Sequence, residues 1–129
     1  SLYVNKPKDL ETAHVRLSVL RDTYNHELFS ITTLKLSLDG TVEAKTAVTL
    51  DPYIAPEGHE AAPLLPDEQV FNAVYEAYSL GFDLHLHAIG DGAVRTALDA
   101  IEAGPLPTCA PPFAISKWLM LPTLSGLVT

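Results

Sequence analysis

Two short segments with alternating apolar and polar residues constrain the fold of this chain most strongly. Residues 30–38, SITTLKLSL, alternate strictly in their second half, with leucines on one side and with Lys35 and Ser37 on the other. Residues 82–88, FDLHLHA, show the same two-residue period. This period is typical of β-strands with two chemically different faces. The polar face of the second segment consists of Asp83, His85 and His87.

A helix is predicted between the two strands, over residues 66–80. Pro66 and the acidic residues after it suit the first turn of a helix, and Gly81 suits its end. A strand, a helix and a second strand form a βαβ unit with parallel strands. The apolar stripe of this helix consists of Val70, Ala73, Val74, Ala77 and Tyr78.

Further elements are expected on both sides of this unit. Residues 8–24 are predicted to form a helix, and residues 92–103 a second one with Asp91 as its N-cap. Residues 41–50 fit either a strand or an irregular segment, and the proline-containing residues 51–63 fit a long loop. The stripe of the first helix consists of Leu10, Ala13, Leu17, Leu20 and Tyr24.

The polar faces of the two strands fit either an open sheet with one face in solvent or a closed barrel. Strands in parallel sheets are usually apolar on both faces, whereas here Lys35 and His87 lie opposite the aliphatic faces. In a closed parallel barrel these side chains point inward, where a charge is costly unless it is paired or bound to a metal. Active sites of barrels lie at the carboxyl ends of the strands, and both residues lie near such an end.

Two short patterns suggest ligand binding, and each has an alternative. His85 and His87 share one strand face, so they can chelate a metal such as zinc, or they can be half-buried residues that hydrogen-bond to neighbours. Gly90-Asp91-Gly92 follows a strand as in dinucleotide sites, but Arg95 stands where the third glycine belongs. A turn with a helix N-cap is the simpler interpretation.

Charge and cysteine content exclude several classes of function. The 129-residue chain has a formal net charge of -8, which argues against nucleic-acid and anionic-membrane partners. Its single cysteine, Cys109, permits no internal disulfide and is expected to be an incidental thiol. No apolar run approaches the length of a membrane span. We expect a cytoplasmic protein.

Two motifs resemble the metal-dependent hydrolases of amidohydrolase family 3. Residues 34–47, LKLSLDGTVEAKTA, are similar to the family's KLFLDGxxExxTA segment. Residues 85–91, HLHAIGD, are similar to its VHAIGD segment and precede a helix of the family's type. A Leu-Pro-x-Glu helix start lies between them, as in the family. The resemblance covers roughly residues 8–103.

The resemblance implies a fold, a chemistry and roles for particular residues. The fold is a (β/α)8 TIM barrel, and the reaction is hydrolysis of C–N bonds in amide-type small molecules by water activated on a divalent metal, for which zinc suits the ligands. His87 corresponds to the metal ligand of the fifth strand, and Lys35 to the lysine of the fourth, which can be carbamylated. The groups expected to support the ligands or to contact the substrate are His85, Asp39, Glu43 and Asp91.

The chain also departs from the family's pattern. The His-x-His pair of the first strand, the later Ile-x-His motif and the aspartate that serves as general base are missing. We therefore expect a barrel fragment over residues 1–104 and a Pro-rich tail over residues 105–129. With two metal ligands at most, the fragment is expected to be inactive alone, and a regulatory or binding module is the alternative function. Unpaired strand edges predict a homodimer.

Overall fold

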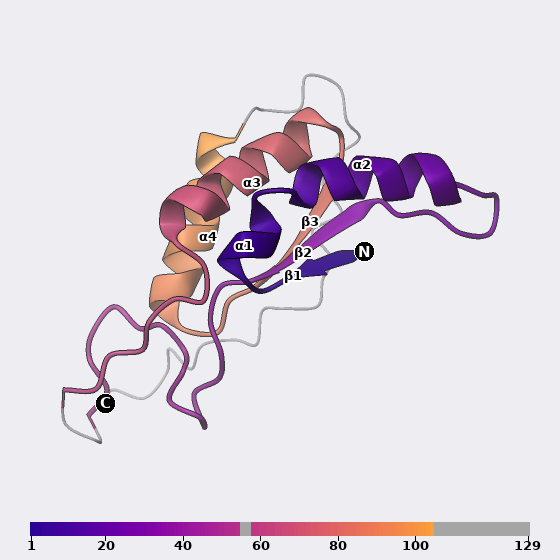
Figure 1. Ribbon diagram of the computed structural model, residues 1–129. Coiled ribbons are helices and arrows are strands. Elements are labelled where there is room, and N and C mark those ends of the chain that lie inside the picture. The colour runs from indigo at the N-terminus through magenta and orange to yellow at the C-terminus, as the bar shows by residue number, and fades with distance from the viewer. Residues whose placement is uncertain (55–57, 105–129) are drawn as a thin grey trace, which may run out of the picture.

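The computed structural model describes residues 1–54 and 58–104, which form a three-stranded parallel sheet with helices on one side (Figure 1). The expected α/β architecture is confirmed, and the predicted tail with Cys109 lies outside the described residues. In chain order the elements are β1 (Leu2–Val4), α1 (Pro7–Leu10), α2 (Ala13–Tyr24), β2 (Thr33–Ser37), α3 (Asp67–Ser79), β3 (Asp83–His87) and α4 (Asp91–Ala103).

The strands lie side by side in the order β1-β2-β3, and each neighbouring pair is parallel. Helix α3 connects β2 to β3, as parallel neighbours require, so the predicted βαβ unit is confirmed. The register places Lys35 opposite His85 and Ser37 opposite His87. Since directly opposite residues point to the same face of a sheet, these four side chains share one face.

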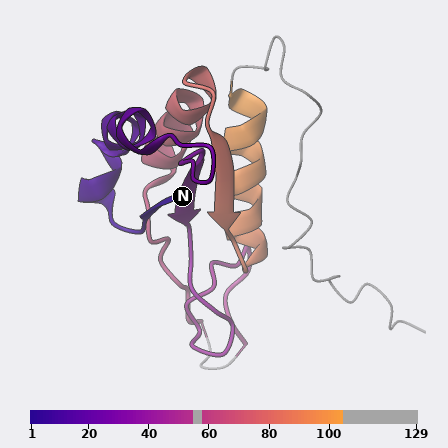
Figure 2. The same cartoon turned by 90° about the vertical axis from the view of Figure 1, so that its right-hand side faces the viewer.

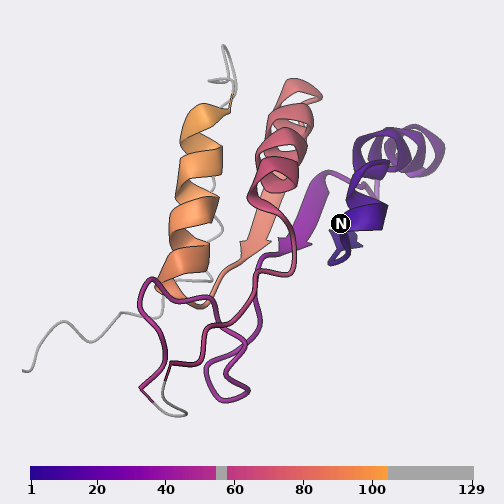
Figure 3. The same ribbon diagram turned by 60° about the vertical axis from the view of Figure 1, so that its left-hand side comes forward.

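The aliphatic face of the sheet packs against the helices (Figures 2 and 3). Leu36 of β2, Leu17 of α2 and Val70 of α3 are each completely buried at 0% exposure. Burial of an aliphatic side chain of this size contributes about 1.5–3 kcal/mol. Helix α4 adds Ala93, Ala97 and Ala100, whose small side chains allow its backbone to approach the core closely. The core thus fixes the sheet and leaves its polar face open in the described residues.

The N-terminal region differs from its prediction in three ways. Strand β1 was not expected, because three residues are too few to show an alternation. The helix predicted over residues 8–24 is broken at Glu11 and Thr12 into α1 and α2, although Leu10 and Ala13 on either side of the break are both buried. Tyr24 is 54% exposed, since the last turn of α2 extends beyond α3 (Figure 1).

The segment after β2 is irregular rather than a strand. Gly40 N donates to Thr46 O at 3.0 Å, and the amides of Thr46 and Ala47 both donate to Thr41 O. These bonds close residues 40–47 into a compact loop, in which Lys45 has a positive φ of 56°. The following residues also form a loop where they are described, as predicted. No helix of the described residues is long and apolar enough to cross a membrane.

The edges of the sheet lead to a prediction about association. Within the described residues, β1 and β3 each have a strand neighbour on one side only. We propose that the isolated chain self-associates, because unpaired strand edges present rows of free backbone donors and acceptors. Sedimentation velocity over a concentration series should show a dimer. A single monomeric species up to high micromolar concentration would contradict this proposal.

Candidate functional site

The open face of the sheet carries a group of polar side chains from all three strands. Lys35 Nζ lies 2.8 Å from His85 Nε2, so β2 and β3 are linked by a lysine–histidine hydrogen bond. Tyr3 Oη lies 3.2 Å from Ser37 Oγ, which links β1 to β2. Both pairs follow from the register, because the partners are direct or diagonal neighbours on one face.

The pKa values of Lys35 and His85 are both lowered. For Lys35, partial burial disfavours the ammonium and lowers the pKa, and Tyr3 opposes this effect. For His85, partial burial is again the largest cause of the lowered pKa, followed by the charges of Lys35 and His87. A neutral His85 accepts the Lys35 hydrogen bond through Nε2, so its ring proton is then on Nδ1.

His87 is held in the opposite tautomer. Its side chain is 28% exposed, and its Nε2 lies 3.1 Å from the backbone oxygen of Gly40. A carbonyl oxygen can only accept a hydrogen bond, so Nε2 carries the proton and donates it. The free lone pair of a neutral His87 is therefore on Nδ1, which is the nitrogen available for a metal.

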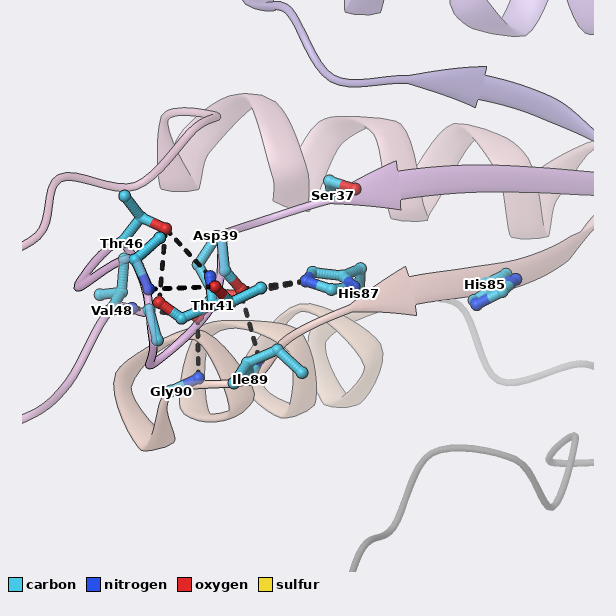
Figure 4. A network of polar contacts seen from close by, with 12 residues as sticks. Ser37, Asp39, Thr41, Thr46, Val48, His85, His87, Ile89 and Gly90 are labelled. Atoms are coloured by element: carbon cyan, nitrogen blue, oxygen red, sulfur yellow. Dashed lines mark hydrogen bonds and ion pairs between the residues drawn. The ribbon is translucent and has the colours of Figure 1, made fainter.

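Asp39 joins the ends of β2 and β3 (Figure 4). Its side chain is completely buried, and its carboxylate accepts three backbone N–H bonds. Oδ1 accepts from Ile89 at 3.0 Å, and Oδ2 accepts from Val48 at 3.0 Å and from Gly90 at 2.8 Å. Oδ1 also lies 3.9 Å from His87 Nε2. One carboxylate thus fixes two loops beside the candidate ligand.

Asp91 and Glu43 contribute differently to the loops after β2 and β3. Gly90 occupies the N-cap position of α4 and Asp91 is its first residue, so the prediction of Asp91 as N-cap was wrong by one position. The reason is that Asp91 Oδ1 accepts bonds from Gly92 N at 3.0 Å and from Leu50 N at 2.9 Å, which ties the loop to α4. Glu43 lies exposed in the 40–47 loop, and its carboxylate bonds to no described residue.

Gly90 is required by the close approach of two backbones. A Cβ at this position would overlap the backbone carbonyl of Val48. We expect Gly90→Ala to lower the free energy of unfolding by about 2 kcal/mol or more, because backbone atoms of both loops must move apart. Urea unfolding followed by circular dichroism measures this loss.

Gly58→Ala is the control for this substitution. Gly58 has a φ of 74°, but a Cβ added there would meet no atom of the described residues within 4 Å, so we expect only the backbone penalty of about 1 kcal/mol. Equal losses in the two variants would show that the contact between Gly90 and Val48 is not restrictive.

The structure brings the predicted site residues together in two groups rather than one. Lys35 pairs with His85, whereas His87 lies beside Asp39 and Gly40. Sequence reasoning placed Ser37 on the polar face of its strand but named neither Ser37 nor Tyr3 as a candidate site residue. Ser37 was visible in the alternation of its strand, but β1 gave no comparable signal.

The described residues do not by themselves complete a metal site. Within residues 1–54 and 58–104, no group of three or more His, Cys, Asp and Glu side chains could hold a metal ion. His87 Nδ1 fits as a ligand because its lone pair is free. Lys35 does not fit as an ammonium and would need conversion to an anionic carbamate. The remaining ligands of a three- or four-ligand centre must come from other residues.

Comparisons with known proteins identify relatives of this chain. The model of the amidohydrolase family matches residues 5–108. The exoenzymes regulatory protein AepA of Pectobacterium carotovorum subsp. carotovorum is 36% identical over 101 residues, which cover 78% of this chain and 21% of that protein. Two crystal structures of uncharacterized metal-dependent hydrolases are 30% identical to this chain.

The first hydrolase, from Pyrococcus horikoshii OT3, has a TM-score of 0.60 and the match covers 69% of this chain and 19% of that one. The second, from Pyrococcus furiosus, has a TM-score of 0.59 with coverages of 69% and 20%. The fold and the matched motifs define a partial α/β barrel of the metal-dependent hydrolase type. The chain belongs to the amidohydrolase family, and it spans about a fifth of the length of these relatives.

Proposed function

We propose that this chain supplies part of the metal centre of a hydrolase acting on C–N bonds of small amide-type molecules. The observation that carries the proposal is the hydrogen bond from His87 Nε2 to Gly40 O, which leaves Nδ1 free at the carboxyl end of β3. Backbone carbonyls commonly orient metal-binding histidines in this way. The metal-dependent hydrolases that share the fold support a divalent metal, and imidazole ligands favour zinc.

The residues of the open face have distinct roles in this proposal. A bound metal would supply the activation of water and the polarisation of the substrate carbonyl. His87 binds through Nδ1, and Lys35 joins the centre only after it leaves His85. His85 then becomes a free imidazole that can contact the substrate. Asp39 and Asp91 hold the surrounding loops, and Glu43 is a solvent-exposed group of the same loop.

A hydrolysis assay tests this proposal. The full-length gene product, with a panel of N-acyl amides, should lose activity on dialysis against a chelator and regain it with zinc. His87→Ala should abolish the recovery, whereas His26→Ala should retain it, because exposed His26 precedes β2 at the opposite end of the sheet. Recovery in the His87→Ala variant would contradict the assigned role.

A regulatory or binding module is the second candidate function. It is favoured by the relative that is named a regulatory protein, and by the incomplete ligand set in the described part of the chain. Under this alternative, the full-length product retains no metal and hydrolyses none of the amides. For either function we propose a cytoplasmic location and no nucleic-acid or membrane partner, because the net charge is -8 and there is a single cysteine.

A further inference from the structure

We propose that Asp39 is a positioning residue that fixes the tautomer and orientation of His87 through the backbone of Gly40. The consequence of this inference rests on the proposed function, because the tautomer explains why Nδ1 of His87 is available as a metal ligand. The contacts that carry it involve no metal. They are the three N–H bonds to Asp39, the bond from His87 to Gly40 and the short separation of the two side chains.

The first step is the rigidity of the junction around Asp39. Val48 belongs to the segment after β2, whereas Ile89 and Gly90 follow β3 and lie 50 and 51 positions from Asp39, so the carboxylate connects segments that are distant in sequence. Hydrogen bonds to a charged acceptor are roughly twice as strong as neutral ones. Gly40 directly follows Asp39 in the chain, so the position of its carbonyl depends on this junction.

The second step is the placement of the acceptor for His87. Gly40 N donates to Thr46 O at 3.0 Å, so the residue is held on its amide side as well. Its oxygen then lies 3.1 Å from His87 Nε2. Asp39 Oδ1, at 3.9 Å from the same nitrogen, adds a negative charge that favours a proton there. Both groups act in the same direction and select the tautomer protonated on Nε2.

The third step is the contrast between His87 and His85. The two rings share one strand face, yet His85 Nε2 faces Lys35 Nζ whereas His87 Nε2 faces Gly40 O. Neutral His85 accepts through Nε2, and His87 donates from it. A purely structural carboxylate would stabilise the loops without requiring this difference. The inference therefore predicts a tautomer signal of His87 that does not follow from the stability of the loops alone.

The test is a nuclear magnetic resonance measurement of imidazole tautomers on the metal-free chain labelled with ¹⁵N, above neutral pH. In the wild type, His87 should show a single Nε2-protonated form with its N–H protected from exchange, whereas the ring N–H of exposed His26, whose Nδ1 accepts from Leu28 N at 3.5 Å, should exchange freely with water. In the folded Asp39→Asn variant, the ring N–H of His87 should lose its protection and exchange as that of His26 does. Thr46→Val removes the bond from Thr41 N to Thr46 Oγ1 but keeps the carboxylate, so His87 should remain protected.

Two results would overturn the inference. One is a wild-type His87 that is protonated on Nδ1 or resembles His26. The other is a folded Asp39→Asn variant with an unchanged His87 signal. If Asp39→Asn does not fold, the wild-type spectrum still tests the inference. His87 must be protonated on Nε2 and protected from exchange there, and it must remain so in Thr46→Val. Added zinc then tests the proposed function separately: an unmoved Nδ1 resonance contradicts metal binding but leaves the positioning role intact.

Discussion

Replacing Asp39 with alanine should lower the free energy of unfolding by about 3 kcal/mol or more. The substitution leaves the amides of Val48, Ile89 and Gly90 without their common acceptor, and a buried unpaired donor costs about 1–3 kcal/mol. Because small domains are stable by only about 5–15 kcal/mol, a loss of this size removes a large part of the total. Urea unfolding followed by circular dichroism measures the effect.

Glu43→Ala is the matched control for this prediction. Glu43 is an exposed carboxylate in the neighbouring loop, so its removal should change stability by less than about 0.5 kcal/mol. Asp39→Asn should fall between the two, because its amide keeps the size but turns a donor toward at least one backbone N–H. An Asp39→Ala variant as stable as Glu43→Ala would contradict the prediction, because water would then replace the carboxylate as acceptor without loss of stability.

The second large effect is expected for metal affinity. His87→Ala should weaken zinc binding by the full-length product by at least about 100-fold, since loss of a direct ligand should exceed the 10–100-fold effect of outer partners. His85→Ala should change the affinity by less than about 10-fold, because His85 is occupied by Lys35 in this structure. Isothermal titration calorimetry with zinc distinguishes the two.

His26→Ala serves as the control for removal of an exposed histidine and should bind zinc as the wild type does. A larger loss in His85→Ala than in His87→Ala would exchange the roles of these residues. It would indicate that the lysine–histidine pair opens to bind the metal through His85 Nε2.

Much of the fold could be predicted because its signals are local. The alternation in residues 34–38 and 83–87 marked both faces of β2 and β3, and the stripe of α3 marked the helix between them. The resemblance to a hydrolase family, made on the motifs around Lys35 and His87, is confirmed by the family match. The assigned roles of the site residues remain predictions.

The remaining features depend on contacts between segments distant in sequence. Nothing near Asp39 in the sequence shows that it accepts N–H bonds from residues up to 51 positions away. Gly90 suggested a turn, whereas the structure shows that it is needed for contact with Val48. The pairing of Lys35 with His85 depends on the strand register, which the sequence alone does not specify.

The most direct test of the central claim is an anomalous-difference map, measured at the zinc edge on crystals of the full-length product. The proposal predicts a peak at about 2.0–2.1 Å from Nδ1 of His87, with Nε2 still bonded to Gly40 O. The same crystals show whether Lys35 has left His85 to join the centre. Zinc bound only at another site, or no bound zinc in crystals grown with the metal, would contradict the metal-binding role proposed for this chain.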